Sequence, residues 1–82
     1  MGAYRIEIVP DRQKLRVLDG DSGALSPGAA VVVLNDVTDY QASAIARRVA
    51  TYLAKIGWAI PAEGFGDTVE KIAADVKAKT GG

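Results

Sequence analysis

Two short segments near the N-terminus alternate strictly between apolar and polar residues. Residues 4–9 read Tyr-Arg-Ile-Glu-Ile-Val and residues 14–18 read Lys-Leu-Arg-Val-Leu. A period of two is typical of strands that bury one face and expose the other. The four residues between them, 10–13, begin with proline, which presets a turn dihedral and cannot donate to a strand ladder. The pattern therefore predicts a β-hairpin.

The register of this hairpin follows from the side chains. If Val9 lies opposite Lys14, apolar residues pair on one face and opposite charges pair on the other. This register pairs Ile8 with Leu15, Glu7 with Arg16 and Ile6 with Val17. A slip of one residue would destroy all three matches, so we expect no other pairing.

A third strand is predicted over residues 29–35 after a loop at 19–28 that is rich in glycine and serine. Its centre is apolar on both faces, which indicates either a central position in the sheet or a covered second face. We assign Val31 and Val33 to the helix-facing side, and Val32 and Leu34 to the far side of the sheet.

The remainder of the chain has helical periodicity. A helix is predicted over 39–56, after a cluster of capping residues at 35–39, and Gly57 is expected to end it and to fold Trp58 back onto Leu53. A second helix is predicted to about Lys79, with Asp67 as its N-cap. The buried stripe of the first helix is expected to comprise Ala42, Ile45, Ala46, Val49, Leu53 and Ile56.

These elements predict one small α+β domain over residues 1–82. Its order is β-β-β-α-α, with a three-stranded antiparallel sheet and two helices packed on one face.

Composition excludes several chemistries. Ten basic and ten acidic side chains give a formal net charge of zero, and the chain contains neither cysteine nor histidine. Disulfides, thiolate or imidazole metal sites, and catalysis by Ser-His or Cys-His pairs are therefore excluded within this chain. No apolar run approaches the length of a membrane span, and the N-terminus lacks a hydrophobic signal region. We expect a cytoplasmic protein without cofactor or membrane contact.

Four local features suggest chemistry, each with a structural explanation beside it. The segment 19–23 resembles a calcium loop but lacks the glutamate that an EF-hand requires. Asp36 and Asp39 could bind Mg²⁺ or transfer protons, and helix capping explains them as well. The segment 64–66, Gly-Phe-Gly, lacks the lysine and hydroxyl of a phosphate loop. Arg47, Arg48 and Lys55 offer a basic helix face that could contact nucleic acid, in a chain with no overall basic excess.

The chain ends in Gly81-Gly82, and in this feature and in its length it resembles ubiquitin-like and sulfur-carrier proteins. The resemblance covers only these two residues. It would imply a carrier function for the tail. In those families the tail leaves a strand, whereas here it follows a predicted helix, where glycine is the usual terminator.

The absence of catalytic groups and the apolar far face of the sheet favour a non-enzymatic interaction or accessory module. We expect a homodimer or another protein partner to cover that face through strand 29–35, although the 19–28 loop could cover it instead, with Leu25 as a lid. Nucleic-acid binding through the basic helix face is the alternative, and a diglycine carrier or a carboxylate enzyme comes after it. The residues expected at the partner interface are Val9, Leu18, Val32, Leu34 and Phe65.

Overall fold

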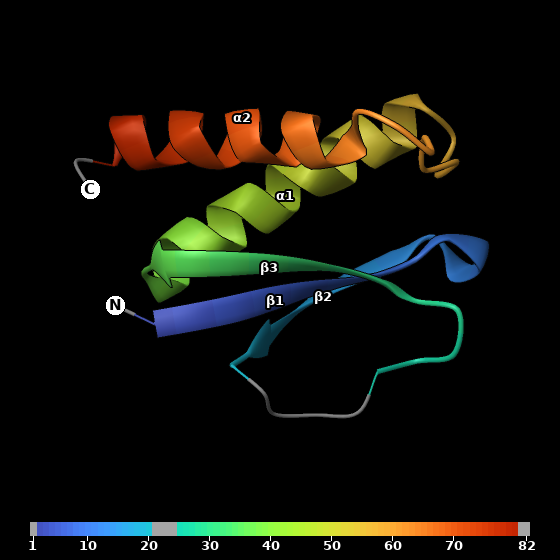
Figure 1. The fold of residues 1–82 in the computed structure, drawn as a ribbon, viewed down its shortest axis with the longest axis horizontal. Coiled ribbons are helices and arrows are strands. Elements are labelled where there is room, and N and C mark those ends of the chain that lie inside the picture. Colours follow the sequence, from blue (N-terminus) through green and yellow to red (C-terminus); the bar gives the residue numbers. More distant parts are fainter. Residues whose placement is uncertain (1, 21–24, 81–82) are drawn as a thin grey trace.

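The structure is a computed structural model that describes residues 2–20 and 25–80 (Figure 1). It contains the predicted small α+β fold, with three antiparallel strands followed by two helices. The strands are β1 (Gly2–Val9), β2 (Lys14–Asp19) and β3 (Ala30–Val37), with a short 3-10 turn over Pro10–Arg12. The helices are α1 (Asp39–Lys55) and α2 (Phe65–Lys79). None of the described helices is long and apolar enough to cross a membrane.

The predicted hairpin is confirmed. Val9 lies opposite Lys14, and the register continues to Tyr4 opposite Asp19. The turn closes with a hydrogen bond of 3.0 Å from the N–H of Gln13 to the carbonyl of Pro10.

The strand order is β2-β1-β3, so β1 occupies the centre of the sheet. The expected central position of β3 is wrong because β3 is an edge strand, and within the single chain two of its valines are exposed. Both outer strands run antiparallel to β1 and are therefore parallel to each other. The chain from β2 to β3 must pass β1, and its described part at residues 25–29 lies on the side of the sheet away from the helices (Figure 1).

The core lies between the sheet and α1. Six residues of α1 are buried, and five of them belong to the predicted stripe; the sixth is Gln41, and Ile56 is half-buried. Both helices lie on the same side of the sheet, and α2 packs mainly against α1 (Figure 1). The largest fully buried apolar side chains are Ile6, Ile8, Val37, Ile45, Val49 and Leu53.

The ends of α1 are fixed by local sequence. Thr38 is the N-cap, because its side chain accepts from the N–H of Gln41 at 3.1 Å and the Gln41 side chain accepts in return from the N–H of Thr38 at 3.0 Å. At the other end Gly57 has a φ of 68°, and the N–H of Trp58 donates to the carbonyl of Leu53 at 2.8 Å. This is the Schellman geometry that the sequence predicts.

The start of α2 differs from the prediction. The helix begins at Phe65, and the N-cap is Gly64 with a φ of 84°, so the predicted N-cap at Asp67 is wrong. A left-handed backbone at Gly64 starts the helix three residues earlier than the side-chain pattern indicates.

Candidate functional site: two free sheet edges

Among the described residues, both β2 and β3 have one edge that no other strand pairs. Such edges present backbone donors and acceptors that a further strand can bind. Each edge is also bordered by a helix, α1 beside β2 and α2 beside β3. These two edges are the places where the fold is open to a partner.

The backbone of β3 alternates between β1 and the free edge. The N–H of Gly20 donates to the carbonyl of Ala3 at 3.0 Å, so odd-numbered residues of β1 bond to β2 and even-numbered ones bond to β3. The even-numbered residues of β1 lie opposite the even-numbered residues of β3, from Ala30 to Leu34. It follows that Val31 and Val33 direct their N–H and C=O groups to the free edge.

The side chains of Val31 and Val33 lie on the face of the sheet away from the helices. They are 37 % and 59 % exposed, and Val33 is among the most exposed large apolar residues described. The assignment of Val32 and Leu34 to this face is therefore wrong. Val32 lies opposite Ile6 and packs against the core, and Leu34 is buried on the helix side.

The physical reason for this error is that a run of four apolar residues is alike on both faces, so that only its pairing with β1 decides which side meets the core, and a β-bulge follows the run. Ala3 faces two residues of β3, because Gly2 lies opposite Val37 while Tyr4 lies opposite Leu34. Asp36, with a φ of 57°, provides the extra residue. The bulge returns Val37 to the core, where strict alternation would place it on the same face as Val31 and Val33.

A groove of about 460 Å³ runs between β3 and α2. The strand contributes its whole length from Ala30 to Asn35, and Phe65 lies at one end of the helical wall. Phe65 is half-buried and its ring stacks on Tyr52, with ring centroids 6.2 Å apart. The residues of α2 that line the groove are Phe65, Gly66, Val69, Glu70, Ala73 and Lys77.

The two other predicted interface residues, Val9 and Leu18, lie on the far face and are half-buried. Val9 is separated from β3 along the sheet and lines the groove beside β2 instead. The structure therefore brings together only part of the expected interface. Val32, Leu34 and Phe65 line the β3 groove together, whereas Val9 borders the β2 edge.

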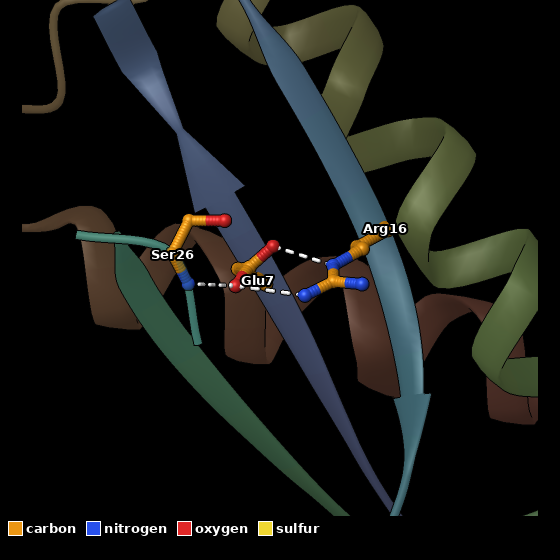
Figure 2. Close-up of polar contacts among 3 residues, drawn as sticks. All are labelled: Glu7, Arg16 and Ser26. Carbon is orange, nitrogen blue, oxygen red and sulfur yellow. Dashed lines mark hydrogen bonds and ion pairs between the residues drawn. The ribbon is translucent and has the colours of Figure 1, made fainter. Parts of the chain in front are cut away.

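Glu7 was expected to be a solvent-side partner of Arg16, and it is almost completely buried, at 2 % exposed. One carboxylate oxygen accepts from Arg16 Nε at 2.6 Å, and the other accepts from the N–H of Ser26 at 2.7 Å (Figure 2). Ser26 belongs to the chain that crosses from β2 to β3. Its contact places residue 26 over Glu7 on the far face, whereas Leu25, the expected lid, is 43 % exposed.

These hydrogen bonds also affect ionisation. The hydrogen bond from Arg16, followed by the one from the Ser26 backbone, lowers the pKa of Glu7 below its usual 4.5, and the carboxylate raises the pKa of Arg16. No sequence signal revealed the burial of Glu7, because it requires a segment nineteen residues away to cross the strand.

The second groove, of about 820 Å³, follows the free edge of β2. Leu15 and Val17 line it from the strand, and Ala46 and Ala50 line it from α1, with Trp58 at one end. Four cationic side chains border it, namely Arg12, Lys14, Arg16 and Arg47. Of these, only Arg16 has an acidic partner among the residues that the structure describes.

The predicted basic face of the first helix is divided. Arg47 borders the β2 groove, whereas Arg48 forms an ion pair with Asp75 of α2. This ion pair lowers the pKa of Asp75, together with Lys79 one turn further along α2 at 3.1 Å. Lys55 is exposed and lines neither groove. These three cations therefore do not form one surface.

The paired carboxylates have separate roles. Asp36 belongs to the bulge in β3, whereas Asp39 begins α1 and accepts a hydrogen bond from the hydroxyl of Tyr4. Within residues 2–20 and 25–80, no three acidic side chains gather into a group that could hold a metal ion. Most of the 19–23 segment and the whole of the diglycine tail lie outside the described residues.

No protein-family model matches the chain, and neither a curated protein nor a solved structure matches it. Evidence about function therefore comes from the two free sheet edges and the grooves beside them.

Proposed function

We propose that the protein is a non-enzymatic interaction module that associates with a second copy of itself through the free edge of β3. The observation that carries this proposal is the combination of an unpaired apolar strand edge with an apolar groove beside it. Two exposed valines direct their backbone groups to this edge, and α2 provides a wall against which added side chains can pack.

The two edges of the sheet differ in a way that favours β3. Natural proteins protect exposed edges with charged side chains, lysine above all. The β2 edge carries Lys14 and Arg16, whereas residues 30–34 of β3 are Ala-Val-Val-Val-Leu, without a charge. An uncharged edge of this length is the one expected to pair with another strand.

A two-fold axis fits the geometry of the β3 edge. Antiparallel pairing of two β3 strands aligns the outward backbone groups of Val31 and Val33 with those of the second copy and forms a continuous six-stranded sheet. The two α2 helices then lie antiparallel on the same side of this sheet. The groove carries one acidic and one basic side chain, Glu70 and Lys77, which supports the proposal because a two-fold axis reverses their order in the second copy.

The test is the mass in solution of the wild-type protein and of Val33→Lys, measured by light scattering at matched concentration. The wild type is expected at twice the 8.6 kDa of one chain and the variant at one chain mass. The substitution belongs at Val33 because this side chain is 59 % exposed, whereas Val32 packs in the core and its replacement would damage the fold itself.

Tyr40→Lys is the matched control, because Tyr40 is 65 % exposed and lies on α1, outside the residues that line the β3 groove. It should leave the dimer intact. A wild-type protein that has the mass of a single chain at every concentration tested would refute the proposal, as would a dimer that Val33→Lys leaves unchanged.

A further inference from the structure

The groove beside β2 differs from the β3 groove in charge. Among the described residues, its only carboxylate is Glu7, which the Arg16 side chain and the Ser26 backbone already occupy. Arg12, Lys14 and Arg47 remain without an acidic partner there. In a chain of zero net charge, this is a local concentration of positive charge.

The β2 edge also offers a backbone ladder. Because Lys14 and Arg16 exchange hydrogen bonds with β1, Leu15 and Val17 direct their N–H and C=O groups away from the sheet. Their side chains face the helix side of the sheet, where α1 presents one stripe of mostly small residues that lines the groove. Its members are Ser43, Ala46, Arg47 and Ala50.

From these observations we propose that the groove between β2 and α1 binds an extended, acidic segment of a partner protein, which adds as a fourth strand to β2. Main-chain hydrogen bonds to Leu15 and Val17 hold the segment in place. Its inward side chains lie against the small residues of α1, and its acidic side chains all lie on the opposite face, beside Lys14.

The same charges determine which strands the edge accepts. A second copy of β2 would place Lys14 and Arg16 beside like charges, which is destabilising between adjacent strands. An acidic strand meets complementary charge instead, and complementarity of this kind provides specificity. The cations of β2 thus oppose self-pairing and favour an acidic partner. This inference concerns a different edge from the proposed dimer and does not depend on it.

The experiment uses a synthetic peptide of alternating Glu and Val, seven residues long with blocked ends, titrated into the full chain. The protein carries Val33→Glu, so that the β3 edge repels the acidic peptide as well as a second copy. Fluorescence anisotropy of the labelled peptide measures affinity, and amide exchange measured by NMR locates the contact. Binding is expected to be saturable and to slow exchange at the Leu15 and Val17 amides.

Two charge reversals test the electrostatic part. Lys14→Glu is expected to weaken binding about three- to tenfold, as is usual for an exposed charge at the border of an interface, whereas Arg47→Glu, on the wall that meets the apolar side of the peptide, is expected to weaken it less. Lys55→Glu is the matched control, because Lys55 is exposed on α1 but does not line the groove, and it should change the affinity less than twofold, as expected for a distant surface charge. The thermal midpoint of each variant establishes that it is folded.

A second peptide separates strand addition from general attraction between charges. It has the same net charge and a proline at the central position, which removes a backbone donor and blocks the ladder. It is expected not to bind. Equal binding of both peptides, or tighter binding of a single-stranded oligonucleotide to the same amides, would overturn the proposal. So would the absence of binding by the Glu and Val peptide at millimolar concentration.

Discussion

Val49 provides the most direct test of how the core is built. Its side chain is completely buried on the face of α1 that meets the sheet and α2. The substitution Val49→Ala removes two methyl groups and leaves the backbone free to remain helical, because alanine is the best helix former. The loss in stability then reports packing alone.

The expected loss is about 2–3 kcal/mol. Roughly 1.5 kcal/mol comes from the transfer of two buried methyl groups, at about 0.8 kcal/mol each. The cavity that they leave adds about 1 kcal/mol if the surrounding side chains do not collapse into it. In a domain of this size, 1 kcal/mol corresponds to about 4–8 °C in Tm, so a decrease of at least about 8 °C is expected.

The assay is thermal and urea unfolding of dilute protein, followed by circular dichroism. Val33→Ala serves as the matched control, because it removes the same two methyl groups from an edge position that is 59 % exposed. It should cost at most about 1 kcal/mol, the full range of strand propensity. If Val49→Ala melts within about 2 °C of the parent, or costs no more than the control, the stripe assigned to α1 does not form the core.

Three further predictions concern ionisation and backbone conformation. Because hydrogen bonds hold the pKa of Glu7 below 4.5, the ionised carboxylate contributes fully to folding stability above pH 4.5, and this stability is lost as the pH falls through the lower pKa of the folded state. Glu7→Gln should therefore reduce the dependence of Tm on pH in the acid range. If that dependence is unchanged, the carboxylate is not held in this way. The hydrogen bond from Tyr4 to Asp39 raises the pKa of Tyr4 to about 12. The contribution of this hydrogen bond to folding stability is therefore complete below pH 10.0 and is lost towards pH 12. In an ultraviolet titration one of the three tyrosines should ionise last, and Tyr4→Phe should remove that phase. Gly57→Ala should lower the free energy of unfolding in urea by about 1–2 kcal/mol, because the backbone at Gly57 has a φ of 68°. Gly66→Ala is the control: Gly66 lies inside α2 with open space around it, so this substitution should be neutral or stabilising. Equal effects of the two substitutions would contradict the left-handed cap at Gly57.

The elements that sequence predicts well are those determined by neighbours close along the chain. The hairpin register follows from charge and apolar matches across a four-residue turn, and all of its pairs are present. The buried stripe of α1 follows from spacings of three and four residues, and Gly57 marks the end of the helix as expected. In each case the deciding interaction spans a few residues, so the pattern contains the information.

The features that sequence does not predict depend on contacts between distant segments. Four consecutive apolar residues in β3 do not reveal which of them face the core, because both faces of the strand are equally apolar. The bulge at Asp36 then changes the alternation that would otherwise place Val37 on the far face. The burial of Glu7 depends on where the crossing chain passes, which strand order determines. The early start of α2 depends on a positive φ at Gly64, one of nine glycines in the chain.

The division of charge between the two edges also bears on whether the proposed assembly closes. Pairing the β3 edge of one copy with the β2 edge of the next would generate an open filament, because the two surfaces are different. That arrangement places the charged Lys14 and Arg16 beside Val31 and Val33 and gives neither set a favourable partner. Pairing of β3 with β3 joins apolar residues to apolar residues and ends after two copies. The cations on β2 therefore act against fibres as well as against β2 self-pairing. Lys14→Val is expected to weaken this protection and form concentration-dependent aggregates in light scattering, and it leaves the Arg16 partner of Glu7 in place. If this variant keeps the mass of the parent at high concentration, the charge of Lys14 does not limit assembly.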